Sequence, residues 1–296
     1  MEKKLTDGHD LIFAAGAPGS KWSRVLSILA HHKDINSSDK EKFPTYQTKV
    51  NFHGQEKNVG MHSSAYFGPG HGIGEFFDDL SSCTKEKFLE EIEKAFDNFD
   101  QGYKIVKSHW FSYNLDWLKE NFPKAKIIMV YNGDAEAFKW WHLVGGWNIK
   151  FPYYDWYGTD EKLYKHIKIE NRLIFDFMRK NKLSFQIKDF KELVQCLNLD
   201  EDLDFYDTMF DEDADYFAGR KLTKGFKKYG IGTTISVYNP DIETNSYLDD
   251  LLPSINNKIT DKHAEWRIDD VLIDLYGKEW LEKIHAIIAG ELTNEN

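Results

Sequence analysis

Short apolar runs alternate along the chain with longer segments of helical periodicity. An apolar run bounded by turn residues is typical of a strand that is buried on both faces of a parallel sheet. The runs lie at 10–15, 104–107, 126–131 and 184–187. Strands that alternate with helices predict an α/β fold, here a three-layer α/β/α arrangement around a central, mostly parallel sheet.

The segments between and after these runs predict helices. In one of them, Phe88, Leu89 and Ile92 begin an apolar stripe that continues to Phe99, which is the pattern of a helix with one buried face. The predicted helices are 22–32, 84–99, 113–121, 135–143, 161–180 and 189–197. Two further helices, broken at Gly277, are predicted over 261–292 and are expected to pack as a cap or on the sheet edge.

The domain organisation follows from what the pattern lacks. No internal repeat and no linker-like stretch interrupts it, so the 296 residues predict a single domain. Residues 36–74 are polar and rich in glycine, and we expect them to form a loop-rich insertion. Residues 200–215 are strongly acidic, which predicts a solvated surface segment.

Composition narrows the classes of partner. The chain has 38 basic and 49 acidic residues and a net charge of −11, which argues against a nucleic acid as partner. Its two cysteines and the spacing of its histidines match no metal site, so no metal is predicted. No apolar stretch approaches the roughly 18 residues of a membrane span, and no leader peptide is evident. A cytoplasmic protein is therefore expected.

The segment from Leu11 to Arg24 carries the first chemical signal. Its apolar run breaks into Gly16-Ala-Pro-Gly-Ser20 and then enters a predicted helix. A strand, a loop of small residues and a helix N-terminus together present backbone N–H groups to one point, where anions bind. Glycine and proline also serve turns that bind nothing, so both interpretations stay open. Lys21 stands where the Walker pattern requires its second glycine, which excludes an ordinary ATP- or GTP-hydrolysing loop.

A second signal lies at the end of the next predicted strand, in Lys107-Ser108-His109. Ligands of doubly wound sheets bind at the carboxyl ends of the strands, so this tripeptide is expected near the 18–23 loop and residues 132–134. Histidine titrates near pH ~6.5 and can take a proton from a hydroxyl group. Lys107, two residues earlier on the strand, is expected on the same side and could neutralise charge on a leaving oxygen. A purely structural histidine is the alternative.

At these residues the chain resembles the sulfotransferase family, which transfers a sulfuryl group from 3′-phosphoadenosine-5′-phosphosulfate (PAPS) to a hydroxyl or amine. The resemblance covers residues 10–200 in order and spacing. Its pieces are Gly16-Ala-Pro-Gly-Ser-Lys-Trp-Ser23, Val106-Lys-Ser-His109, Asn121-Phe-Pro-Lys-Ala-Lys-Ile-Ile-Met-Val130, Tyr131-Asn-Gly-Asp134 and Phe185-Gln-Ile-Lys-Asp-Phe-Lys-Glu-Leu193. It implies a P-loop NTPase-like, sulfotransferase-like fold with His109 as general base and Lys107 beside the bridging oxygen.

The resemblance also implies which residues hold the donor. They are Pro18, Gly19, Ser20, Lys21, Trp22, Ser23, Asn132 and Lys139, with Arg220 and Lys221 near Gly225 matching a late loop that closes over the donor. Several positions depart from the family pattern. The basic residue after the proline is Gly19, the next glycine is Lys21, and a small threonine is Trp22. The arginine and serine that grip the 3′-phosphate are Tyr131 and Lys139.

The stretch from Trp140 to Tyr157 is dense in aromatic residues. Most of these rings are expected to pack in the core, but the resemblance implies that the region borders the acceptor pocket. Aromatic rings there would suit a flat or carbohydrate-like small molecule.

Three functions are therefore carried forward. The first is a PAPS-dependent sulfotransferase. The second is a P-loop kinase-like phosphotransferase that uses Lys21, Trp22 and Ser23 with Mg²⁺ and ATP. The third is a catalytically inactive, sulfotransferase-like binding protein.

Overall fold

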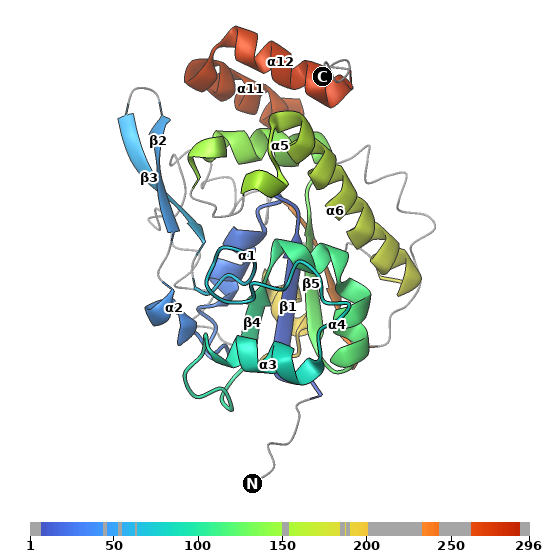
Figure 1. The fold of residues 1–296 in the computed structure, drawn as a ribbon. Helices are drawn as coiled ribbons and strands as arrows, with labels where there is room; N and C mark the ends of the chain where they lie inside the picture. Colours follow the sequence, from blue (N-terminus) through green and yellow to red (C-terminus); the bar gives the residue numbers. More distant parts are fainter. Residues whose placement is uncertain are drawn as a thin grey trace.

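A computed structural model gives the fold (Figure 1). It describes residues 7–43, 46–52, 55–62, 64–149, 154–183, 187, 190–200, 233–242 and 262–290. Among these residues, no helix combines the length and the apolar character that crossing a membrane requires.

The central sheet has four strands in the order β4-β1-β5-β6. β1 (Leu11–Gly16) pairs in parallel with β4 (Lys104–Lys107) and with β5 (Lys126–Tyr131). These three strands confirm the prediction from the apolar runs, and with them a mostly parallel α/β sheet. β6 (Thr234–Tyr238) runs antiparallel to β5 and was not predicted. Of the predicted strand at 184–187, only Ile187 is described, and it bridges to Ile235.

Helices connect the strands close to where the periodicity predicts them. The long helix α6 begins after Thr159, whose side chain accepts a hydrogen bond from Lys162 N–H, a standard N-cap. The predicted helix at 84–99 is shorter than expected and ends at Glu93. Asn98, within the predicted range, has a positive φ of 50°, which is not helical. The bounds are α1 (Trp22–Leu29), α2 (Asp39–Lys42), α3 (Lys85–Glu93), α4 (Leu115–Asn121), α5 (Asp134–Leu143), α6 (Asp160–Lys180) and α7 (Phe190–Cys196).

The two faces of β1 belong to two different apolar clusters. Phe13 packs edge-on against the rings of Phe88 and Phe122, on the side of α3, α4 and α6. Ile12 and Ala14 pack on the opposite side, in the cluster that contains residues of α1 and α7. Alternation along a strand places successive side chains on opposite faces. Helices thus cover both faces of the sheet (Figure 1).

The predicted loop-rich insertion at 36–74 is wrong in part. It contains α2 and an antiparallel hairpin of β2 (Tyr46–Phe52) and β3 (Gln55–His62). The sequence of β2, Tyr-Gln-Thr-Lys-Val-Asn-Phe, alternates with a period of two, which is the pattern of a strand with one polar face. Its high polar content hid this alternation.

The C-terminal segment confirms the prediction of two helices broken at Gly277. α11 (Lys262–Tyr276) and α12 (Lys278–Ala289) lie over α5 and α6 (Figure 1). Leu272, Leu281 and Ile284 share a buried cluster with residues of α5 and α6. The pair therefore forms a cap.

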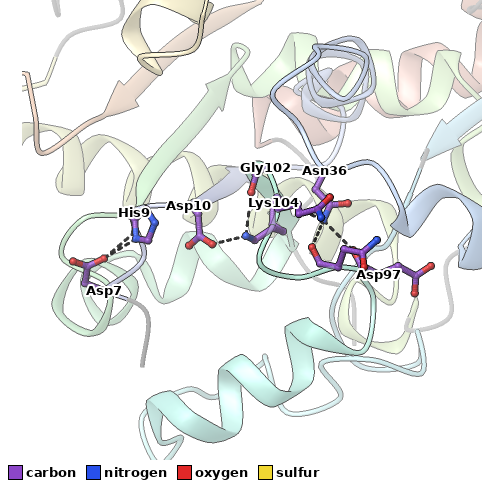
Figure 2. A network of polar contacts seen from close by, with 9 residues as sticks. Asp7, His9, Asp10, Asn36, Asp97, Gly102 and Lys104 are labelled. Carbon is purple, nitrogen blue, oxygen red and sulfur yellow. Dashed lines mark hydrogen bonds and ion pairs between the residues drawn. The ribbon is translucent and has the colours of Figure 1, made fainter. Parts of the chain in front are cut away.

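Polar contacts fix the amino ends of the central strands (Figure 2). Lys104, fully buried at the start of β4, forms an ion pair with Asp10 and donates to the Gly102 carbonyl. The Asn36 amide donates to the carbonyls of Asp97, Asn98 and Gln101. This edge is occupied by structural contacts, which leaves the carboxyl edge for ligands.

Candidate functional site

A pocket opens beside the carboxyl end of β1, with about 660 Å³ of space when the part open to solvent is included. β1 lies between β4 and β5 in the sheet. The carboxyl ends of these parallel strands form the edge at which ligands usually bind in an α/β sheet. The lining comes from the loop after β1, α1, the start of the 3₁₀ segment η1 (His109–Tyr113), the end of α5 and the residues that follow it. Its residues are Pro18, Gly19, Lys21, Trp22, Ser23, Arg24, His109, Trp140, Trp141, Val144, Ile149, Tyr154 and Tyr157.

The loop after β1 is held in a narrow geometry. Gly19 has a φ of 79°, and a Cβ atom there would lie 1.8 Å from the Ala137 carbonyl oxygen on α5. Lys21 adopts a φ of 70° at the residue before α1, a conformation that costs a non-glycine residue about 1 kcal/mol or more. The Thr233 hydroxyl lies 2.8 Å from the carbonyl oxygens of both Ser20 and Tyr131. The loop is thus tied to α5 and to the end of β5.

Two cationic side chains line the cavity. Burial lowers the pKa of Lys21 to about 8, with a further decrease from Arg24 and an opposing effect of Glu136. The Lys21 ammonium lies 4.4 Å from the centre of the Trp140 ring. Burial lowers the pKa of Arg24 to about 10, so both side chains remain mainly protonated at neutral pH. A partly desolvated pair of cations favours an anionic ligand.

His109 is held from both its backbone and its ring. Its N–H donates to the Tyr66 hydroxyl at 2.9 Å. Its Nδ1 lies 3.1 Å from the Gly16 carbonyl oxygen, and because that oxygen can only accept, this contact favours the tautomer with the hydrogen on Nδ1. Nε2 is then the acceptor nitrogen of the neutral ring. Burial lowers the pKa of His109 to about 3, against the effect of the Gly16 hydrogen bond, so the ring is neutral at physiological pH.

Glu170, which the sequence analysis missed, lies beside this histidine. Its Oε2 is 4.0 Å from His109 Nδ1, its side chain is fully buried on α6, and burial raises its pKa well above the usual range. A signal was present in the sequence. Glu170 occupies a position of the apolar stripe formed by Leu163, Ile167 and Ile174, where a carboxyl group is unexpected.

Lys107 lines a different pocket from His109, together with Asp39 and Ser64. The expectation that the two residues act together stays a prediction. Burial lowers the pKa of Lys107 to about 8, and the Asp39 carboxylate opposes this. The same-side rule for positions two apart holds only within a strand, and β4 ends at Lys107 before the chain turns into η1.

Five further predicted donor contacts lie elsewhere or are not described. Ser20 is fully buried beneath the loop and is not part of the lining. The Asn132 carbonyl accepts a hydrogen bond from the Asn171 amide at 3.2 Å. Lys139 forms an ion pair with Asp269 of α11 at 3.0 Å. The last two, residues 220 and 221 (Arg220 and Lys221), lie outside the described residues.

The aromatic stretch after α5 supplies one wall of the cavity. Trp140, Trp141, Tyr154 and Tyr157 all line it. These rings are mostly buried, so they offer faces and edges to the cavity rather than to bulk water. Because Lys21 and Arg24 line the same cavity, it combines a site for an anion with one for an apolar or planar group.

Comparison with known proteins adds no assignment: the chain matches no protein-family model, no curated protein and no solved structure. In the ranges that the structure describes, no group of three or more His, Cys, Asp or Glu side chains is arranged to hold a metal ion. The argument for function therefore rests on the geometry of the cavity.

We expect Gly19→Ala to destabilise the protein much more than Gly72→Ala. Both glycines have a φ near +80°, but a Cβ at Gly72 meets nothing within 4 Å. Gly72→Ala should therefore cost only backbone strain, about 1 kcal/mol. Gly19→Ala adds a clash with α5 that should cost about 1–3 kcal/mol more. Urea unfolding measures both, and equal losses would contradict the close packing of the loop on α5.

We expect Glu170→Gln to raise the melting temperature at neutral pH. The folded protein keeps the Glu170 proton above the pKa at which the unfolded chain loses it, so this group makes the wild-type protein less stable as pH rises above about 4.5. Glutamine lacks that titration. The difference in melting temperature should grow from pH 4.5 to pH 7.5, and a constant difference would show that Glu170 is not held neutral.

Proposed function

We propose that the protein is a PAPS-dependent sulfotransferase that transfers a sulfuryl group to a hydroxyl or amine acceptor. One observation carries the proposal. The Gly16 carbonyl, at the start of the loop after β1, accepts a hydrogen bond from His109 Nδ1–H, so Nε2 is left to act as a base. The ordered motifs, the cavity at the sheet's carboxyl edge and its two cations support the same function. We include in this proposal that the fold is P-loop NTPase-like and sulfotransferase-like.

In this mechanism the chain's residues have separate tasks. The loop and the N-terminus of α1 hold the 5′-phosphate of the donor. Lys21 and Arg24, which line the same pocket as His109, neutralise the charge that develops on the oxygen between sulfur and that phosphate. His109 Nε2 takes the proton of the acceptor. The wall that contains Trp140 and Tyr157 excludes water and holds a small, planar or carbohydrate-like acceptor.

The first test is a ligand titration followed by thermal unfolding. A ligand that binds only the folded protein raises its melting temperature by mass action. We expect adenosine 3′,5′-bisphosphate, the product of the donor, to raise it and ATP with Mg²⁺ to have little effect. A shift with ATP and Mg²⁺ alone would replace the proposal with the kinase-like alternative. If neither ligand acts, the non-catalytic alternative becomes the better interpretation.

The second test is His109→Ala, assayed by bisphosphate release with a panel of phenols, alcohols, amines and sugars. Loss of a general base should lower kcat by about 100-fold or more and leave the affinity for the bisphosphate unchanged. His31→Ala, an exposed histidine, is the control. Because the His109 pKa is about 3 in the free protein, wild-type kcat/KM should stay level from pH 7 to pH ~5. An unaltered rate in His109→Ala would remove the catalytic assignment.

A further inference from the structure

The buried carboxyl group of Glu170 has no evident structural purpose. Its side chain is fully buried, and neither carboxyl oxygen meets the geometry of a hydrogen bond within the described residues, although the nearby Ser112 hydroxyl opposes the rise in its pKa. A buried polar group without a hydrogen bond costs roughly 1–3 kcal/mol by mutational data. An apolar residue would suit the stripe of α6 better, and groups that oppose stability in this way concentrate at functional sites.

The surroundings of Glu170 direct attention to His109. Glu170 Oε2 lies 4.0 Å from His109 Nδ1, the ring nitrogen opposite the proposed base Nε2. The Ser112 side chain on η1 partly opposes the rise in the Glu170 pKa. Tyr66, Tyr113 and Tyr157 are close enough for the Glu170 charge to raise the pKa of each phenol. None of these four groups is a cation, and His71 is held neutral near pH 7 because burial lowers its pKa to about 4. His109 is therefore the group whose charge Glu170 can influence.

We propose that Glu170 is a positioning residue for His109: the carbonyl oxygen of its protonated carboxyl group helps Gly16 to keep the hydrogen on Nδ1 and accepts that N–H when the ring becomes charged. The proposal rests on the sulfotransferase function for its role in catalysis. Its effect on the ring itself does not depend on that function. Closing the gap from 4.0 Å to hydrogen-bond distance requires a shift of about 1 Å.

The step balances without any loss of the Glu170 proton. The acceptor oxygen forms a bond to sulfur, and its proton moves to His109 Nε2. The bond from sulfur to the bridging oxygen breaks, and its electron pair stays on the departing phosphate. The ring is then an imidazolium with hydrogens on both nitrogens. A buried cation is expensive without an acceptor for each hydrogen, and Glu170 and Gly16 share the Nδ1 hydrogen.

The test compares Glu170→Leu and Glu170→Gln, with Ile174→Leu as a packing control on the same stripe. Glutamine keeps a carbonyl oxygen, and leucine removes it. In protein labelled with ¹⁵N-histidine, with His109 identified by its absence in His109→Ala, wild type and Glu170→Gln should show only the Nδ1–H tautomer. Glu170→Leu should show a mixture, because Gly16 alone then holds the hydrogen. The same pure tautomer in all variants would overturn the proposal.

Kinetics supply the second measurement. Glu170→Leu should lower kcat by about tenfold or more without changing KM for PAPS, whereas Glu170→Gln and Ile174→Leu should stay within about threefold of wild type. If wild type transfers no sulfuryl group but the tautomer changes in Glu170→Leu, the proposed function fails and the positioning role stands. If wild type is active and Glu170→Leu keeps both its tautomer and its kcat, the positioning role alone fails.

Discussion

The parallel pairing of β1 with both β4 and β5 is the constraint on which the structure depends. Every residue of β1 is buried, and a helical layer packs on each of its faces. At its carboxyl end the chain continues into the loop that begins at Gly16. That path fixes the Gly16 carbonyl next to the end of β4, where His109 begins η1. A backbone oxygen of the central strand thus favours one tautomer of a side chain nearly a hundred residues later in the sequence.

The site combines groups that a folded chain usually avoids. Lys21 and Arg24 are cations with little access to water, His109 is kept neutral by burial, and Glu170 keeps its proton. Burying these ionisable groups lowers the stability of the folded protein. It also gives a cavity whose surface is mainly apolar and whose charge is positive. Under the proposed function, such a cavity would favour an anionic, partly aromatic ligand over both a neutral apolar molecule and a small hydrated ion.

What the sequence could predict follows from the range of the interactions involved. β1, β4, β5 and the C-terminal helices were predicted because continuous apolar runs and helical periodicity are local properties. β6 was missed because it takes its place only by pairing with β5, whose partner residues lie 103 to 111 positions earlier in the sequence. The loop after β1 and His109 were predicted to share a site from the rule for strand ends, and they do. Lys107 and Glu170 required the path of the chain after β4 and the packing of α6, which spacing alone does not contain.

The cap of α11 and α12 has a consequence for how the protein is made. α5 carries Trp140 and Trp141 of the cavity wall and the Ala137 carbonyl that restricts the Gly19 loop, and its outer face is covered by the two C-terminal helices, with Lys139 bound to Asp269. During synthesis β1, β4, β5 and the loop leave the ribosome well before α11 and α12 do. The cavity wall therefore gains its outer support only after residues 262–290 have been made.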